Sequence, residues 1–304
     1  NPALAFIATL ALGDAALAQL RPPEHKPVIG ARMPALSPDG KQLAFVYRGD
    51  IWLAPAAGGR ATPLTQHIET DAYPLFSPDG KWVAFASRRN GNMDIFAVPV
   101  EGGLARQLTW HSGHELPQGW SPDGRFVIFS GKRDTPNYAL FTVDTTNLRT
   151  EMLAEDYAPL YSPNFSPDGR KVVYGRYGFH WTRPRYHGSG AEQIWILDRD
   201  KGTRRPLTTN ESQHLWTRFL PDGKSVVTVT VGEVTPSSGP LNEPIAPFLD
   251  NAERTPNLWR LDLNGKARRL TSFIGGGVRY PSVAGRSGDI AFEHGADLWL
   301  LKSG

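Results

Sequence analysis

The chain has no cysteine among its 304 residues and only three methionines. The absence of cysteine excludes disulfide bonds, thiol nucleophiles and thiolate metal sites. Charge of one sign is also scarce, because 33 basic and 30 acidic residues leave a net charge of only +3. A chain without a strong positive field lacks the usual signature of nucleic-acid binding. We therefore expect no nucleic-acid partner.

Several enzyme motifs are missing as well. The sequence contains no Gly-x-Ser-x-Gly elbow, no His-Glu-x-x-His motif and no phosphate-binding loop. No serine is paired by spacing with a base and an acid, although a triad formed in space stays open. His111, His114 and Glu115 form the one dense group of metal-ligand types, and a metal there would need another well-placed ligand. We expect loop histidines, no metal, no cofactor and no catalytic residue.

The N-terminal segment is apolar over residues 3–12 and continues to Ala16-Leu17-Ala18. This small-x-small pattern is typical of a signal-peptidase site, so residues 1–19 are predicted to be the remnant of a signal peptide and the protein to be periplasmic or otherwise exported. A short buried or interfacial helix is the alternative. The stretch is too short for a permanent membrane span. Because the first residue is Asn and no basic segment precedes the stretch, we expect the chain to begin inside a longer reading frame.

Glycine and proline are plentiful, with 31 and 26 copies, and many belong to one repeated tetrapeptide. Ser-Pro-Asp-Gly occupies 37–40, 77–80, 121–124 and 166–169, and Leu-Pro-Asp-Gly occupies 220–223. Proline presets φ, aspartate bonds local backbone and glycine accepts positive φ, so each copy predicts a tight turn between two strands. The period of roughly 40–45 residues is that of four-stranded propeller blades.

Each unit also carries an aromatic residue in its expected third strand. We expect these rings to pack between neighbouring blades; they are Trp52, Phe96, Phe141, Trp195, Trp259 and Trp299. Leu-Thr pairs at 64–65, 108–109, 207–208 and 270–271, with the weaker Met152-Leu153, predict the end of a fourth strand. The sixth unit has no such pair.

The repeats therefore predict an all-β fold over residues 31–304, a six-bladed β-propeller of four-stranded antiparallel blades whose sixth blade is incomplete. Two sources of the missing strand are open. Residues 20–30 form a linker or the closing strand, or sequence beyond residue 304 supplies it. An unpaired edge is otherwise left on the sixth blade.

The long loops are expected on the face opposite the Pro-Asp-Gly turns, because turns between strands one and two all lie on one face of a propeller. Insertions at 177–191 and 232–256 fall on that opposite face. The face also carries a basic arc, which is broken at the fifth unit by Glu233, Glu243, Asp250 and Glu253; its cations are Arg48, Arg88, Arg89, Lys132, Arg133, Arg176, Arg183 and Arg185. The arc is either solvated loop charge or a rim facing a peptide carboxylate or an acidic partner.

The repeat resembles known families. Phe-Ser-Pro-Asp-Gly-Lys-Trp-Val-Ala-Phe-Ala-Ser-Arg at 76–88, Asp-Ile-Phe-Ala-Val at 94–98 and Gly-Gly-x-x-x-Gln-Leu-Thr at 102–109 resemble the propeller repeats of the TolB, dipeptidyl-peptidase IV and tricorn protease families. The pattern His180-Trp181, Tyr186-x-Gly188 and then Ile194-Trp195 is similar to an insertion in the N-terminal six-bladed propeller of tricorn proteases.

This resemblance implies a non-catalytic propeller that gates peptides to or from a downstream protease domain, with a second propeller, a PDZ-like domain and oligomeric assembly. The implied binding residues are the rim cations Arg88, Arg89, Lys132, Arg133, Arg183 and Arg185, with the group His180, Trp181 and Tyr186. That aromatic group could equally be the small core of a folded-back loop. The alternative function is a free-standing periplasmic TolB-like module that binds a protein partner. A hydrolase with its site inside the propeller is a third reading with less support.

Overall fold

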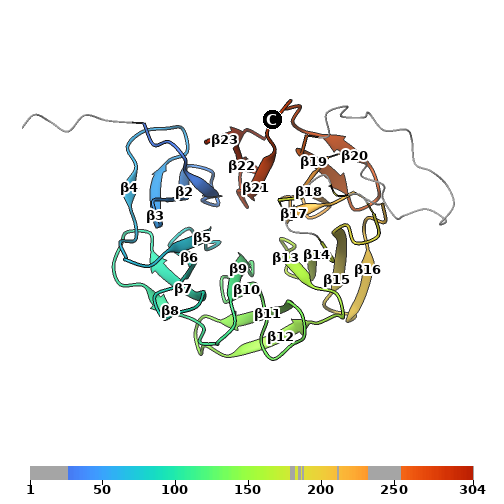
Figure 1. Ribbon diagram of the computed structural model, residues 1–304, viewed down its shortest axis with the longest axis horizontal. Helices are drawn as coiled ribbons and strands as arrows, with labels where there is room; N and C mark the ends of the chain where they lie inside the picture. The colour runs from blue at the N-terminus through green and yellow to red at the C-terminus, as the bar shows by residue number, and fades with distance from the viewer. Residues whose placement is uncertain are drawn as a thin grey trace, which may run out of the picture.

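The structure is a computed structural model that describes residues 27–178, 182–183, 186, 188–210, 212–231 and 255–303. Within these residues the chain forms 23 β-strands and no helix. The strands make six antiparallel sheets arranged in a ring (Figure 1). The predicted all-β six-bladed propeller is thus confirmed.

Successive strands run from the centre of the ring to its rim. The first three blades contain β1 (Arg32–Leu36), β2 (Gln42–Tyr47), β3 (Asp50–Pro55) and β4 (Thr62–Pro63); β5 (Asp71–Phe76), β6 (Trp82–Ser87), β7 (Asp94–Pro99) and β8 (Arg106–Gln107); and β9 (Glu115–Trp120), β10 (Phe126–Gly131), β11 (Ala139–Asp144) and β12 (Thr150–Ala154). The last three contain β13 (Leu160–Phe165), β14 (Lys171–Arg176), β15 (Gln193–Asp198) and β16 (Thr203–Pro206); β17 (Leu215–Phe219), β18 (Ser225–Thr230), β19 (Asn257–Asp262) and β20 (Ala267–Arg269); and β21 (Val278–Val283), β22 (Ile290–His294) and β23 (Asp297–Leu301).

The sixth blade has three strands in the described residues, in the order β21-β22-β23, as expected. Residues 27–30 form no strand, and the Gly30 N–H donates to the Ala296 carbonyl at 3.2 Å. Residues 20–26 lie outside the described part, so the closing strand stays a prediction.

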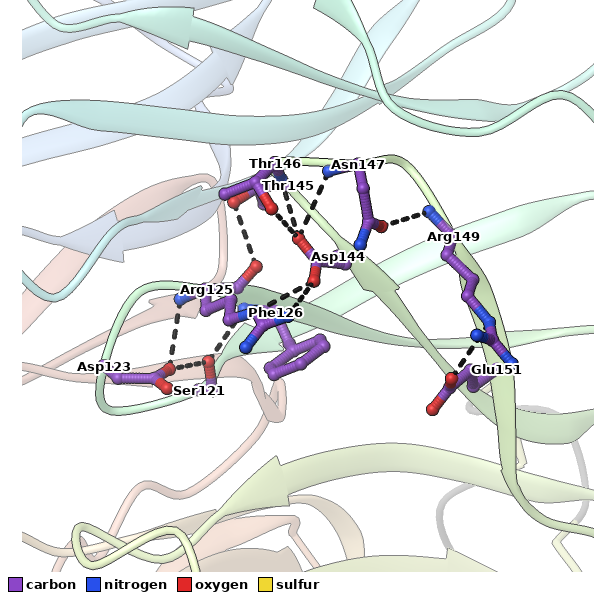
Figure 2. A network of polar contacts seen from close by, with 10 residues as sticks. All are labelled: Ser121, Asp123, Arg125, Phe126, Asp144, Thr145, Thr146, Asn147, Arg149 and Glu151. Atoms are coloured by element: carbon purple, nitrogen blue, oxygen red, sulfur yellow. Dashed lines mark hydrogen bonds and ion pairs between the residues drawn. The ribbon is translucent and has the colours of Figure 1, made fainter.

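The Pro-Asp-Gly turns join the first and second strands of their blades, as predicted. Figure 2 shows the third: the Ser121 hydroxyl donates to the Asp123 carboxylate, which also accepts the Arg125 N–H at 3.1 Å. The same hydroxyl accepts the Phe126 N–H at 2.8 Å. Ser37, Ser77 and Ser166 repeat the arrangement. The serine of the motif therefore fixes the turn to the strand that follows it.

These turns also contact one another around the ring. A Cβ on Gly80 would lie 3.6 Å from the Pro38 ring of the preceding blade, and one on Gly169 would lie 3.5 Å from Pro122. The turn glycines have φ between 61° and 77°, a region in which a Cβ is strained. Glycine is therefore required here for both conformation and close approach.

The hydrophobic core lies between neighbouring blades. Ile51 of the first blade, for example, belongs to one buried cluster with Phe85 and Phe96 of the second. Of the third-strand aromatics, Phe96, Phe141 and Trp259 are buried, as expected, whereas Trp52 and Trp195 are half-buried. Trp299, in the sixth blade, is 46% exposed.

The Leu-Thr pairs lie just after the fourth strands rather than closing them. The Thr65 hydroxyl accepts the Ile51 N–H at 3.0 Å, and Thr109, Thr208 and Thr271 do the same for the third strands of their blades. Each threonine hydroxyl thus accepts a hydrogen bond from a backbone N–H near the start of the third strand. The pairs thus mark where the chain leaves the sheet.

The junction between the sixth and first blades contains no shared sheet among the described residues. As at the other junctions, the two blades are separate sheets, and a small apolar cluster of Leu36, Ala284 and Ala291 together with polar contacts holds them. The Leu36 N–H donates to the Ser282 hydroxyl at 3.0 Å, and the Arg286 N–H donates to the Pro38 carbonyl at 2.8 Å. At the opposite face Arg32 pairs with the buried Glu293 at 3.3 Å. We call this junction the seam.

Candidate functional site in the central channel

The inner strands β1, β5, β9, β13, β17 and β21 surround the axis of the ring (Figure 1). Three adjoining pockets are lined by residues in and around these strands. The middle pocket encloses about 160 Å³ and shares lining residues with the other two. One end, the proline mouth, has about 370 Å³ and is lined by Pro38, Pro78, Pro122, Pro167 and Pro221. The other end, the aromatic mouth, has about 360 Å³ and is lined by Tyr73, Tyr138, Tyr161, Trp216 and Tyr280 among others. The two mouths lie on opposite faces of the ring.

The inner strands bend sharply at the aromatic end. Five residues of these strands have φ between 49° and 56°, and at each the pairing with the second strand shifts register; they are Met33, Tyr73, Ser162, Trp216 and Tyr280. Left-handed backbone at a residue other than glycine costs roughly 1–3 kcal/mol and is found preferentially at functional sites. All five side chains line the channel. The fold thus accepts strain to place side chains there.

The rings of the aromatic mouth contact one another across blades. Tyr280 and Trp216 have centroids 4.7 Å apart, and Tyr73 lies 6.4 Å from Tyr280. Tyr138 and Tyr161 are 5.5 Å apart. Tyr73, Trp216, Tyr280 and Gln118 line both the aromatic mouth and the middle pocket. These four residues form the waist of the channel.

Glu192, just before β15, places a carboxyl group at the aromatic mouth. Its residue is 5% exposed, and its Oε1 has no hydrogen-bond partner. A Cβ at Gly175 would overlap Oε1, and one at Gly178 would lie 2.9 Å from Oε2, so two glycines make room for the carboxyl. Burial raises the pKa of Glu192 to about 8, against the lowering influence of the Arg218 charge.

Arg218 of β17 lies on the other side of the waist, in the middle pocket. Its guanidinium donates to the Gln118 side chain at 3.1 Å and to the Ser162 carbonyl at 3.3 Å, so it bridges three blades. Burial lowers the pKa of Arg218 to about 10, and the charge of Glu192 opposes that change. Arg218 therefore stays cationic at neutral pH.

Three of the predicted rim cations are engaged in their own blades, and one of them, Arg176, donates to both oxygens of Asp156 at 3.0 Å. Arg89 donates to both oxygens of the fully buried Asp71 at 3.0 Å, and its side chain is 18% exposed. Arg133 pairs with the buried Glu115 at 3.3 Å. Arg89 and Arg133 also lie over a phenylalanine of the third strand. The structure thus gives these three arginines a structural role that the loop sequence alone did not indicate.

The remaining predicted site residues are spread over the face. Arg88 and Lys132 are exposed, and no ion pair or side-chain hydrogen bond of theirs is found among the described residues. Arg183 is exposed, and its carbonyl accepts the N–H of the partly buried Tyr186 at 3.0 Å. His180, Trp181 and Arg185 lie outside the described residues. The acidic insertion, with Glu233, Glu243, Asp250 and Glu253, lies outside them too.

The histidine group has local roles. The His111 Nδ1 accepts the Gly113 N–H at 2.9 Å, and the His114 Nδ1 accepts the Met93 N–H at 3.1 Å. Glu115 faces Arg133. In the part of the chain that the structure describes, no three side chains of metal-binding type come together.

The sequence carries one signal for the channel residues, a recurring proline in the first strand of the blade. A proline stands three residues before the turn motif in three units, at Pro34, Pro74 and Pro163, and Pro281 occupies the same place in the sixth. The residue before each proline is one of the five strained positions. Glu192 and Arg218 had no comparable signal, because their burial depends on neighbouring blades.

Comparisons with known proteins agree with this architecture. Residues 31–304 match the family described as the tricorn protease N-terminal beta propeller domain. Tricorn protease homolog 1 of Streptomyces coelicolor is 43% identical over 54 residues, which are 18% of this chain and 5% of that protein. Putative tricorn protease homolog 2 of the same organism is 48% identical over 59 residues, again 5% of its length.

Solved structures share the fold. A crystal structure of the tricorn protease matches 90% of this chain and 25% of its own, with a TM-score of 0.70 and 20% identity. A putative TolB from Agrobacterium tumefaciens matches 79% of this chain and 80% of its own, with a TM-score of 0.63 and 23% identity. The chain thus spans about a quarter of the solved tricorn protease. No helix in the described residues is long and apolar enough to cross a membrane. From its match over residues 31–304, the chain belongs to the family of tricorn protease N-terminal β-propeller domains.

Proposed function

We propose that this propeller is the non-catalytic front part of a tricorn-like serine protease, and that its channel gates peptides to or from a protease domain encoded downstream. The observation that carries the proposal is the channel itself, narrowed by Tyr73, Trp216 and Tyr280 at its waist. Family membership supports it. The activity, assembly and partners of the longer protein are all part of the proposal.

The waist suits a gate because its side chains are held inward by strained backbone. Aromatic rings offer large apolar faces together with polar edges or hydroxyls, so they contact peptides of varied sequence. Gating requires that peptides pass this point rather than travel around the ring.

The test uses the absence of cysteine from these 304 residues. In the longer protein, with any cysteine outside this segment replaced, Gln118→Cys at the waist is labelled with a bulky maleimide, and peptide hydrolysis is compared before and after labelling. We expect labelling to slow hydrolysis at least about five-fold by blocking the channel. The control is Thr62→Cys in the exposed strand β4, where the same label should have no effect. Equal rates with the waist labelled and unlabelled would contradict gating.

The basic rim is proposed to contact peptide carboxylates through Arg88 and Lys132, because both are exposed whereas Arg89 and Arg133 are paired. The double change Arg88→Ala, Lys132→Ala should weaken capture of peptides with a free C-terminal carboxylate. Capture of the same peptides with an amidated C-terminus should not change. His180, Trp181, Arg183, Arg185 and Tyr186 remain proposed contacts of the same face.

The second candidate is a free-standing TolB-like module that binds a protein partner. It is favoured by the match to 80% of the putative TolB chain. The downstream reading frame separates the two, because only a protease needs a catalytic domain there. Peptidase activity of the propeller alone, abolished by changing one of its serines, would contradict both. For either candidate we propose export, on the apolar segment 3–12 and Ala16-Leu17-Ala18.

A further inference from the structure

The carboxyl group at the aromatic mouth has an unused acceptor. Glu192 Oε1 is buried and has no hydrogen-bond partner among the described residues. Buried polar atoms in native proteins nearly always have partners, so each exception calls for an explanation. Gly175 and Gly178 lack side chains, and this leaves the space that the Glu192 carboxyl occupies. A ligand that donates hydrogen bonds would satisfy Oε1.

A second polar atom in the same mouth is also unpartnered. The hydroxyl of Ser130, at the end of β10, lines the aromatic mouth and is 1% exposed. Its Oγ has no hydrogen-bond partner. The mouth therefore offers two buried oxygen atoms to a donor.

The lining of the mouth favours positive charge. Its five aromatic rings present faces of negative potential, which attract cations within about 6 Å. Among the described residues that line it, Glu192 is the one with a carboxyl group, and no lysine or arginine is present. Arg218 lies beyond the waist, so its charge opposes deeper entry of a cation.

We propose that the aromatic mouth binds a primary ammonium group of a peptide, with Glu192 as its counter-charge and the rings of Tyr161, Trp216 and Tyr280 as its cage. The inference rests on the proposed function, in which peptides enter the channel. The ammonium group comes either from the peptide N-terminus or from a lysine side chain. An ammonium has three donors, which suits Oε1 and the Ser130 hydroxyl.

Binding of this kind releases a proton. Because burial raises the pKa of Glu192 to about 8, most of the carboxyl is protonated in the empty mouth at pH 7. An ammonium nearby favours the carboxylate, so the acid proton leaves to solvent as the ion pair forms. The titratable groups that face Glu192 are Tyr161, whose pKa is raised, and Arg218, which is already charged, so neither changes its state at pH 7.

The experiment measures peptide binding to the 304-residue chain by calorimetry at pH 7. Three peptides of one lysine-free sequence are compared: one with a free N-terminus, one acetylated, and one acetylated with a single lysine added. We expect the free peptide to bind about ten-fold more tightly than the acetylated one, equivalent to about 1.4 kcal/mol. It should also release a fraction of a proton, seen by repeating the titration in buffers of different ionisation enthalpy. If the lysine peptide regains the affinity, a lysine side chain also serves as a source of the ammonium.

Glu192→Gln keeps the shape of the side chain and removes its charge. It should reduce the preference for the free peptide to less than two-fold, remove the proton release, and leave the acetylated peptide unaffected. The matched control is Glu115→Gln, a buried carboxyl that pairs with Arg133 and lies outside the three channel pockets. It should keep the preference.

Two results would overturn the inference. Equal binding of free and acetylated peptides removes the ammonium site but leaves peptide gating standing. If the Glu192→Gln variant still prefers the free peptide to the acetylated one, the ammonium group binds elsewhere in the chain. Failure of gating has a separate readout, the rate of peptide hydrolysis with the waist labelled.

Discussion

The two mouths of the channel are built from opposite ends of the same inner strands, yet they follow different rules. At the proline mouth the positive φ angles fall on the turn glycines, and serine and aspartate satisfy each other and the backbone that follows (Figure 2). At the aromatic mouth four residues adopt left-handed backbone and a carboxyl group is buried without a full set of partners. One end is built for stability, and the other gives up stability to place side chains.

The carboxyl groups at the two mouths also differ in the direction of their pKa shifts. A hydrogen bond from Ser121 lowers the pKa of Asp123, and the turn aspartates of the other units, Asp39, Asp79, Asp168 and Asp222, have lowered pKa values too. Burial raises the pKa of Glu192 to about 8. Acid therefore weakens one end of the ring, and alkali weakens the other.

The largest loss of stability is expected from a variant that fills the space beneath Glu192. Gly175→Ala should destabilise the protein by about 3 kcal/mol, because its Cβ overlaps the carboxyl group and the whole Glu192 side chain must move. The measurement is urea unfolding. In a Glu192→Ala background the same change should cost much less, since the overlap is gone.

Gly131→Ala is the control for that experiment. A Cβ there would lie 3.4 Å from the His114 carbonyl, an ordinary contact, so its cost should stay within about 1 kcal/mol. Equal losses at Gly175 and Gly131 would mean that the glycine beneath Glu192 is not specially required.

Alkaline pH should weaken the aromatic end. The folded state holds the Glu192 proton up to about pH 8, whereas the unfolded chain releases it near its ordinary value of 4.5, so stability falls as pH rises through this window. Between pH 6.5 and 9 the loss should be about 2 kcal/mol. Thermal unfolding across this range measures it.

Glu192→Gln should flatten this pH profile without abolishing it, because burial also raises the pKa of Glu115 to about 7. His214, whose pKa burial lowers to about 3, destabilises the fold only below its ordinary value of 6.5, outside the range. A profile unchanged by Glu192→Gln would show that the carboxyl is already ionised in the folded protein.

Backbone strain at the aromatic mouth can be separated from side-chain loss. At Tyr73, with φ of 56°, glycine relieves a conformation that costs alanine about 1–2 kcal/mol. Tyr73→Gly should therefore be more stable than Tyr73→Ala by that amount. At Leu75 in the same strand, where φ is not positive, the usual order with alanine more stable should hold. The same order at both positions would argue against strain.

The smallest effect is expected at the proline mouth. Ser121→Ala removes the hydroxyl that links Asp123 to the following strand, at a cost of about 1 kcal/mol. Because the hydroxyl lowers the pKa of Asp123, its stabilisation is present above the ordinary aspartate value and is lost as pH falls through the folded value. The variant should thus lose stability at pH 7 and differ less from the parent in acid, as measured by unfolding at pH 7 and pH 3.

Much of the fold could be predicted because its signals are local. Pro, Asp and Gly act within one turn, so four residues of sequence were enough to place five of the turns, and the third-strand aromatic Trp299 added the sixth blade. The serine was missed as a structural element, because its role is a hydrogen bond to the strand five residues on. The proline that follows Tyr73 or Tyr280 was visible, but its meaning depends on a register shift against the second strand.

The site was harder to predict because it is assembled from distant segments. Rim arginines were identified by their loops, yet Arg89 and Arg133 pair with buried acids some 18 residues earlier, at the start of the same blade. Glu192 and Arg218 belong to different blades and meet only near the axis. Burial of such charges is a property of the closed ring, which no short pattern encodes.

The seam has a mechanical consequence for the ring as a whole. Among the described residues the sixth and first blades meet through non-covalent contacts, such as the hydrogen bond from Leu36 to Ser282 and the apolar cluster of Leu36, Ala284 and Ala291. These contacts set the spacing between β1 and β21. Because both strands line the channel, a change at the seam acts on the width of the channel as well.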